Sequence, residues 1–209
     1  MKNKIPDQEK VWDRIAQKWK VYRQRASPTV QSFLGENVKL GDKVLDLGCG
    51  SGRNFMKVGG KIYGVDFSGE MLEYARKRGE RLGLDFELKK SESWDLDFDD
   101  NFFDVGICMA LLHCIPDKRK RKKTLREFYR VLKKGGVGLV AVWGRGSPRL
   151  RNKSKECFIG WTVREGEGKE KRYTYVYDKE ELEAELRQVG FKILKSWEER
   201  NVNVIVEKV

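Results

Sequence analysis

The sequence is poor in the features that mark secreted, metal-binding or membrane-spanning proteins. Its four cysteines show no CxxC or CxC spacing, which argues against a disulfide framework and against a cysteine metal site. The residues that follow Met1 are charged and lack the apolar run of a signal peptide, and no stretch approaches the length of a membrane span. We therefore expect a cytoplasmic protein that holds no metal and does not enter a membrane.

Positive charge is in excess and is unevenly distributed. The formal net charge is +12. Residues 118–134 hold ten lysines and arginines against one acid, residues 1–25 hold eight against three, and residues 145–155 hold five against none. A basic surface of this kind favours an anionic polymer, such as a nucleic acid, as a partner. The alternatives are a merely solvated basic face and heat adaptation, although heat adaptation usually balances the two signs.

Short apolar segments alternate with helical ones after two N-terminal helices. The pattern predicts an α/β fold, a doubly wound, seven-stranded, mainly parallel sheet that is Rossmann-like and has helices on both faces. About five polar residues join the last two strands, too few for a crossover, so the last strand should be antiparallel. The expected strands are 43–47, 62–65, 86–88, 105–109, 137–143, 191–197 and 202–207. The expected helices are 7–25, a second that starts at Ser27-Pro28, 68–81, 118–132 and 179–189.

The whole chain, 1–209, is expected to form one domain of this type. Residues 1–40 would form an N-terminal helical cap, and residues 144–172 an insertion on the substrate side. This insertion is polar and glycine-rich, with Cys157–Val163 as its only apolar patch. Such excursions at the rim of an α/β sheet often supply lids and substrate contacts. The alternative is an ordinary disordered loop.

A glycine-rich turn follows the first predicted strand, in the pattern D-x-G-x-G-x-G from Asp46 to Gly52. Small residues let the backbone approach a ligand there. Asp66 ends the second strand, where a carboxylate accepts hydrogen bonds from both ribose hydroxyls of an adenosine cofactor. The dinucleotide-binding pattern has a different spacing. Asp46 would repel a pyrophosphate but can face the positively charged methionyl end of S-adenosylmethionine (SAM).

These motifs resemble the class I SAM-dependent methyltransferases, and the likeness covers nearly the whole chain. In that family an acidic and a small residue after the third strand bind adenine, and Glu92 and Ser93 occupy those places. The fourth strand leads to His113 and matches the strand after which the methyl group meets its acceptor. The resemblance implies SAM as the cofactor, held by Trp19, Asp46, Gly48, Cys49, Gly50, Gly52, Asp66, Phe67, Met71, Glu92, Ser93 and Met109.

One branch of the family matches further. The segment Val11–Trp19 resembles its opening helix Y-N-x-I-A-x-x-(aromatic), and Leu112-His113 stands where the branch has I-H-H. Residues 171–177 and 197–208 are similar to its R-Y-Y-H-V and closing N-W-C-V-I-x-x-K segments. This branch is the tRNA wobble-uridine carboxymethyl methyltransferases, which esterify 5-carboxymethyluridine in the anticodon stem-loop. The resemblance implies tRNA as substrate and a small zinc-binding activator protein as a partner.

A carboxylate acceptor is already ionised at neutral pH, so it needs orientation and desolvation more than a strong base. An arginine that holds the carboxylate bidentately would orient it, and Arg23 and Arg172 are the candidates. Tyr173 would lend a hydroxyl and His113, the only histidine, a ring donor near the methyl group. The alternatives are a structural histidine, Arg23 as surface charge, and Arg172 as a phosphate ligand.

Two basic segments flank the expected substrate mouth and predict RNA binding. The phosphate contacts would come from Lys118, Arg119, Lys120, Arg121, Lys122, Lys123, Arg145, Arg149 and Arg151. The aromatic residues Trp161, Tyr173, Tyr175 and Tyr177 could stack an unpaired base, but the tyrosines equally fit one face of a strand.

Two other functions share some of these features. A methyltransferase acting on a small molecule, such as a quinone, sterol or metabolite, would use the same cofactor motifs, but it would favour an apolar lid and residues 144–172 are polar. A methyltransferase-like RNA-binding subunit without activity would need no cofactor motif, whereas Asp46, Gly48, Gly50 and Asp66 are all present.

Overall fold

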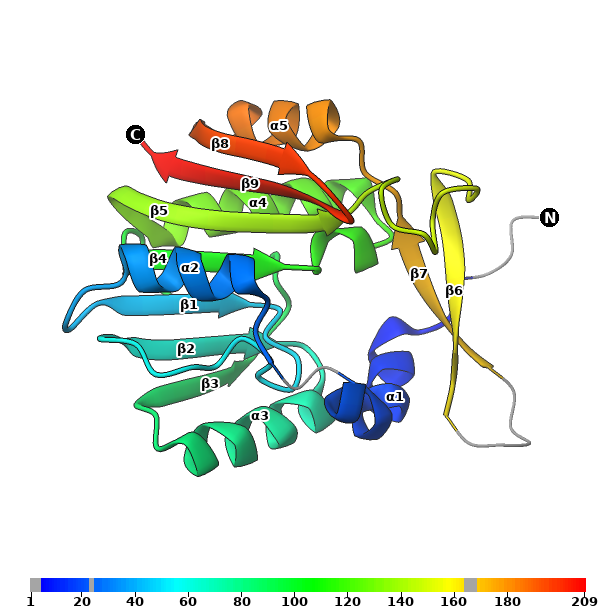
Figure 1. Ribbon diagram of the computed structural model, residues 1–209, viewed down its shortest axis with the longest axis horizontal. Helices are drawn as coiled ribbons and strands as arrows, with labels where there is room; N and C mark the ends of the chain where they lie inside the picture. The colour runs from blue at the N-terminus through cyan, green and yellow to red at the C-terminus, as the bar shows by residue number, and fades with distance from the viewer. Residues whose placement is uncertain (1–4, 23–24, 164–168) are drawn as a thin grey trace.

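Seven strands form one twisted sheet in the computed structural model, which describes residues 5–22, 25–163 and 169–209 (Figure 1). The strand order is β3-β2-β1-β4-β5-β9-β8. Strands β1 to β5 run parallel, and β9 is antiparallel to both of its neighbours, β5 and β8. The bounds are β1 (Lys43–Leu47), β2 (Lys61–Asp66), β3 (Phe86–Lys90), β4 (Phe103–Met109), β5 (Leu132–Trp143), β8 (Phe191–Glu198) and β9 (Asn201–Lys208). The predicted fold class, including the antiparallel last strand, is confirmed.

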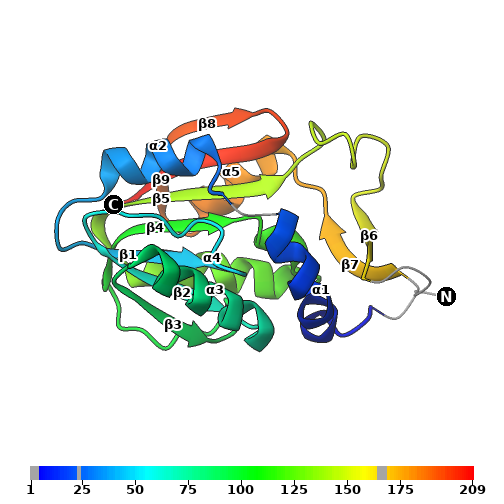
Figure 2. The same ribbon diagram turned by 60° about the horizontal axis from the view of Figure 1, so that its bottom comes forward.

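Helices cover both faces of this sheet, as expected for a doubly wound fold (Figure 2). Helices α2 (Pro28–Asn37) and α3 (Gly69–Leu82) pack on one face, where apolar side chains such as Val44 and Ile62 receive them. Helices α4 (Lys118–Val131) and α5 (Lys179–Gln188) pack on the other face. Helix α1 (Gln8–Tyr22) instead lies beyond the carboxyl ends of the parallel strands (Figure 1).

Helices α2, α3 and α4 begin at polar residues that accept a hydrogen bond from the first turn. Ser27 accepts from the Val30 amide at 3.3 Å, and Ser68 accepts from the Met71 amide at 3.1 Å. Asp117 accepts from the Arg119 amide at 2.7 Å and so opens α4 despite its run of cations. These caps fix the ends of the helices that face the carboxyl edge of the sheet.

Residues 144–172 form more than a loop. Strands β6 (Glu156–Thr162) and β7 (Lys169–Tyr175) pair antiparallel as a separate two-stranded sheet. The expected apolar patch in 157–163 is mostly strand β6, because Cys157 and Ile159 pack with Trp143, Leu150 and Val176. The β6–β7 sheet stands beside α1, beyond the carboxyl edge of the main sheet (Figure 1). The disordered-loop alternative is therefore wrong for the described part of this segment.

Candidate active site

A cavity of about 520 Å³ opens at the carboxyl ends of the parallel strands. The strand order reverses between β1 and β4, and doubly wound sheets bind their ligands at this reversal. Ten of the residues predicted to hold the cofactor line the cavity: Trp19, Gly48, Cys49, Gly50, Asp66, Phe67, Met71, Glu92, Ser93 and Met109. The sheet topology thus brings together residues that are far apart in the sequence.

The glycine turn after β1 is hydrogen-bonded to β2 and forms part of the cavity wall. The amides of Gly48 and Cys49 both donate to the Val65 carbonyl, at 2.8 and 3.0 Å. Gly48 has a φ of +75°, and a Cβ there would lie 3.0 Å from Leu111, so only glycine fits without strain. Gly52 does not line this cavity. It faces α3 instead, where a Cβ would lie 3.1 Å from Ala75, so its small size serves helix packing rather than cofactor contact.

Asp66 presents a carboxylate to the cavity from the end of β2. Its two oxygens accept hydrogen bonds from the amides of Gly50, at 2.8 Å, and Ser68, at 3.0 Å. Burial raises the pKa of Asp66 to about 6, although these backbone amides oppose the shift. Each carboxylate oxygen has a second acceptor position. The site therefore fits the two ribose hydroxyls of an adenosine cofactor.

Asp46 lies one layer behind the cavity rather than on its surface. It is 1% exposed, and both its oxygens lie 3.4 Å from the Asn54 side-chain amide. Asn54 lines the cavity, and the sequence analysis did not single it out. The pKa of Asp46 is raised to about 7, chiefly by burial and also by the charge of Asp66, while the Asn54 hydrogen bond opposes the shift. Asp46 can therefore act on a bound cation through its field and through Asn54.

These two pKa values predict a pH dependence for cofactor binding. The ionised carboxylates are the forms that accept ribose hydroxyls and attract a sulfonium cation. Because the pKa values are raised to about 7 for Asp46 and about 6 for Asp66, SAM affinity should be greatest above about pH 7 and should fall as the pH drops through 6. Calorimetry in buffers of different ionisation enthalpy should detect proton release on binding near pH 6.5. An affinity that is constant from about pH 8 to 5 would contradict this assignment.

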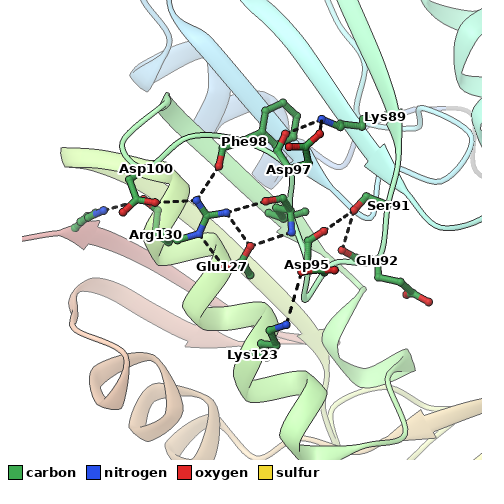
Figure 3. Close-up of polar contacts among 12 residues, drawn as sticks. Lys89, Ser91, Glu92, Asp95, Asp97, Phe98, Asp100, Lys123, Glu127 and Arg130 are labelled. Carbon is green, nitrogen blue, oxygen red and sulfur yellow. Dashed lines mark hydrogen bonds and ion pairs between the residues drawn. The ribbon is translucent and has the colours of Figure 1, made fainter.

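The segment that carries Glu92 and Ser93 is clamped to α4 by one arginine (Figure 3). The Arg130 guanidinium donates to the carbonyls of Leu96, at 2.8 Å, and Phe98, at 2.7 Å. It also pairs with Glu127 and Asp100, each at 2.8 Å. Glu127 completes the clamp by accepting from the Leu96 amide at 2.9 Å. This network fixes the turn after β3 at the cavity rim.

Within that turn, the two predicted adenine ligands are placed differently. Ser93 is buried, and its hydroxyl lies 3.0 Å from that of Thr124 in α4. Because the hydroxyl is used in this contact, Ser93 can contact a ligand through its backbone. Glu92 is half-buried, and burial raises its pKa while the charge of Lys120 lowers it. Both residues line the cavity.

Arg172 lies in an aromatic box on the acceptor side of the cavity. The residue is 3% exposed and lines the cavity from β7. Its guanidinium carbon lies 5.0 to 5.7 Å from the ring centroids of four indoles. They belong to Trp12, Trp19, Trp143 and Trp161. Indole faces attract cations and exclude water, so the box holds a desolvated positive charge.

His113 stands beside this charge in the short 3-10 helix η1 (Leu112–Cys114). Its Nδ1 accepts the Trp143 amide at 3.1 Å, and its ring stacks on the Trp143 indole at 4.9 Å. Burial, and then the charge of Arg172, lowers the pKa of His113 to about 3. The ring is therefore neutral, and with Nδ1 accepting, its one proton is on Nε2. His113 is thus both structurally bonded and able to donate one hydrogen bond in the cavity.

Two other residues that were predicted to contact the methyl acceptor do not lie with Arg172 and His113 in the described structure. Tyr173 follows Arg172 in β7, and successive side chains of a strand point to opposite faces. Its ring lies 6.1 Å from that of Phe158, away from the cavity lining, so the structure contradicts a role for its hydroxyl at the acceptor. Arg23 lies outside the described residues.

The structure corrects one residue of the basic run that opens α4. Arg121 is 2% exposed, and it donates to the carbonyls of Ile115, at 2.8 Å, and Pro116, at 3.1 Å. Its guanidinium also lies 4.1 Å from the Tyr175 ring centroid. A phosphate cannot reach this buried group, so the expected RNA contact is wrong. The other predicted phosphate contacts remain accessible: Lys118, Arg119, Lys120, Lys123, Arg145, Arg149 and Arg151 are exposed, and Lys122 is half-buried.

Arg121 should therefore affect stability rather than RNA binding. Arg121→Met leaves two carbonyls without their donor and removes the charge that balances Glu185, so the free energy of unfolding should fall by about 2–3 kcal/mol. Lys118→Met, on the same helix but exposed, should change it by less than about 0.5 kcal/mol. Urea denaturation of the two variants measures the difference. Equal stabilities would contradict the structural role of Arg121.

Within the described residues, no cluster of histidine, cysteine and carboxylate side chains could hold a metal ion. No helix there is long and apolar enough to cross a membrane. The four cysteines are free thiols.

Comparison with known proteins agrees with this site. Residues 44–136, which span β1 to the start of β5, match the family model described as a methyltransferase domain. Residues 44–136 carry a methyltransferase domain. The match includes the glycine turn, Asp66 and His113, so this domain carries most of the residues that line the cavity, although Trp19 and Arg172 lie outside it. SAM is the cofactor that this domain and its structural neighbours imply.

Curated proteins with tRNA methyltransferase names are similar to most of this chain. A probable tRNA methyltransferase 9B of Mus musculus is 29% identical over 153 residues, which cover 72% of this chain and 32% of the relative. A tRNA (carboxymethyluridine(34)-5-O)-methyltransferase of Arabidopsis thaliana is 30% identical over 136 residues, covering 64% and 32%. The chain thus spans about a third of the length of these two relatives.

A solved structure extends the fold comparison to nearly the whole chain. It is a complex between the Haloferax volcanii Trm112 methyltransferase activator and the putative methyltransferase, with a TM-score of 0.69 and 19% identity. The alignment covers 97% of this chain and 98% of the other. At this identity the likeness establishes the fold alone.

Proposed function

We propose that the protein transfers the methyl group of SAM to tRNA, and that the acceptor is the carboxylate of a 5-carboxymethyl wobble uridine. The observation that carries the proposal is Arg172, a buried cation that lines the cavity within a box of indoles. When bound, SAM supplies an electrophilic methyl group. The chain's own residues must then hold an anionic acceptor in line with it.

Arg172 suits a carboxylate for two reasons. Its planar guanidinium can donate two parallel hydrogen bonds, which fixes the orientation of a carboxylate as well as its position. The indoles around it exclude water, and a less hydrated carboxylate is a better nucleophile. His113 can add one hydrogen bond from Nε2, and its low pKa keeps it from acting as a proton acceptor at neutral pH. No general base is needed, because the acceptor is ionised already.

The charge and the relatives support tRNA as the molecule that carries this acceptor. Lys118, Arg119 and Lys123 are exposed at the start of α4, and Arg149 is an exposed residue that also lines the cavity. Such cations can neutralise backbone phosphates around the cavity mouth. The names of the mouse and Arabidopsis relatives both specify a tRNA methyltransferase.

A small activator protein is proposed as a partner on the strength of the Haloferax complex. Strands β3 and β8 are the two edges of the sheet and offer backbone groups for strand addition. Purified enzyme should gain activity when the activator of the same organism is added. Equal rates with and without it would show that this chain works alone.

Transfer of tritium-labelled methyl groups from SAM to tRNA tests the proposed function. A methyl ester is hydrolysed by mild alkali, whereas methyl groups on ring nitrogen, carbon or ribose oxygen are not. We expect alkali-labile label in tRNA that carries the carboxymethyl group and no label in tRNA that lacks it. Alkali-stable label would reject the carboxylate acceptor. Transfer to quinones or small carboxylates but not to tRNA would reject the RNA substrate.

A further inference from the structure

A second, smaller cavity of about 250 Å³ lies between α1 and α3. Four residues of α3 line it, Tyr74, Lys77, Arg78 and Arg81, and their spacing of three and four places them on one helix face. Lys20 of α1 lines the opposite side. Figure 1 shows α1 beside the end of α3 that faces the carboxyl edge of the sheet. We call this feature the α1–α3 basic pocket.

The charge of this pocket is uncompensated. Among the residues that the structure describes, no acidic residue lines it, and none of Lys20, Lys77, Arg78 and Arg81 has an ion-pair partner within 4.0 Å. Acids are present on the same helix, but Glu73 pairs with Arg76 outside the pocket. Like charges gathered on neighbouring helices repel one another, so this arrangement costs stability in the protein alone.

One nitrogen of Arg78 also lacks a hydrogen-bond acceptor. Its Nε is buried and has no hydrogen-bond acceptor in the described part of the chain, while one of its terminal nitrogens donates to the Arg53 carbonyl at 3.5 Å. Burial, and then the charge of Arg81, lowers the pKa of Arg78. Lys20 is held over the Tyr74 ring, at 4.1 Å from its centroid. The donors are therefore positioned but lack an anion.

The pocket borders the active-site cavity. Ser51, in the glycine turn, lines both cavities. Trp19 lines the larger one, and the next residue, Lys20, lines the smaller. A polymer with one base in the active site would pass over this boundary with its backbone.

We propose that the α1–α3 basic pocket binds a backbone phosphate of the substrate RNA, at or next to the nucleotide whose base enters the active site. This inference rests on RNA as the substrate. A phosphodiester has one negative charge and two free oxygens, which suit lysines together with an arginine fork. Contacts of this kind set the register of an RNA on a protein without selecting its sequence. The pocket would thus place the target nucleotide relative to Asp66 and Arg172.

The test neutralises the two exposed cations that α3 contributes to the pocket, in the double variant K77A/R81A. Alanine preserves helix propensity, and Arg78 is kept because it bonds to the Arg53 carbonyl. The matched control, K57A/R76A, removes the same charge at exposed positions outside the pocket. We expect K77A/R81A to bind an anticodon stem-loop about tenfold more weakly and to lower the salt slope of log K by about 1. The control should change neither quantity.

Stem-loops with a single uncharged methylphosphonate linkage, moved along the loop, locate the phosphate. At one position near the target nucleotide, the substitution should weaken binding to wild type and to the control but not to K77A/R81A. The same response of wild type and K77A/R81A at every position would overturn the proposal. SAM affinity, measured by calorimetry, should be unchanged in K77A/R81A. Weaker SAM binding with an unchanged RNA salt slope would assign the pocket to the cofactor and overturn the proposal.

The outcomes separate this inference from the proposed function. If wild type binds and methylates RNA, but K77A/R81A and the control bind alike, the phosphate site is wrong and the function stands. If K77A/R81A binds RNA more weakly, but wild type transfers no methyl group to RNA, the phosphate site stands and the function is wrong. If wild type does not bind RNA, both are wrong.

Discussion

Arg172→Lys should lower methyl transfer to tRNA by about 100- to 1000-fold and leave SAM affinity within about twofold. A lysine keeps the positive charge but cannot form two parallel hydrogen bonds to a carboxylate, and its compact ammonium cannot fill the space between four indoles. The loss should be mainly in kcat, because the acceptor would still bind through its phosphates but would not be aligned with the methyl group.

A matched variant separates this effect from damage to β7. Lys171→Ala changes the preceding, exposed residue of the same strand and should retain near-normal activity. Calorimetric SAM binding checks that the Arg172→Lys cavity is intact, since Trp19 lines the cofactor cavity and also faces Arg172. If Arg172→Lys keeps more than about a tenth of wild-type kcat with normal SAM affinity, bidentate orientation of the acceptor by Arg172 is wrong.

Asp66→Ala should weaken SAM binding by about 2 kcal/mol, which is about 30-fold. The substitution removes the acceptor for the ribose hydroxyls and also leaves the Gly50 and Ser68 amides without their partner. Asp66→Asn should have a smaller effect, because its one amide oxygen can still accept while its nitrogen cannot. Glu70→Ala, which removes an exposed acid from the start of α3, is the control and should leave SAM affinity unchanged.

Calorimetric titration with SAM measures this series directly. The expected order of affinity is wild type and Glu70→Ala, then Asp66→Asn, then Asp66→Ala. The pH dependence of SAM affinity adds a second criterion. The part of the loss of affinity that occurs near pH 6 should disappear in Asp66→Asn. Normal SAM affinity in Asp66→Ala would refute the role of this carboxylate.

The main sheet could be predicted from the sequence because its parallel strands are buried on both faces. Four of the five residues of β1 are buried, and such short, continuous apolar segments are distinct from the amphipathic helices between them. The boundary of β5 was less accurate. The strand starts at Leu132 rather than at the expected residue 137, and its pairing with β4 shifts register near this start.

The β6–β7 sheet could not be predicted from its composition. Residues 144–172 are polar and rich in glycine, and the apolar contacts that hold β6 come from Leu150 within this segment and from Trp143 and Val176 outside it. The aromatic box has the same origin, since its four tryptophans come from α1, β5 and β6. The family resemblance pointed to Arg172, but only the tertiary structure shows what surrounds it.

The mistaken assignment of Arg121 had a signal in the sequence. The buried residues of α4 are Arg121, Thr124, Leu125, Phe128 and Val131, which follow the helical period from the apolar end of the helix back into the basic run. The sequence analysis considered only the number of charges in this run, so it overlooked the helical period that places Arg121 on the buried face. Asn54 had no comparable signal, because its contact with Asp46 depends on the path of the glycine turn.

Mass spectrometry of nucleosides from tRNA incubated with the enzyme and SAM tests the central claim most directly. The tRNA should carry 5-carboxymethyluridine at the wobble position, and wild type should be compared with Arg172→Lys. We predict conversion of this nucleoside to its methyl ester by wild type, little conversion by Arg172→Lys, and no new methyl group elsewhere. A methyl group on any other nucleoside, or an unchanged 5-carboxymethyluridine under conditions where SAM binds, would contradict the account.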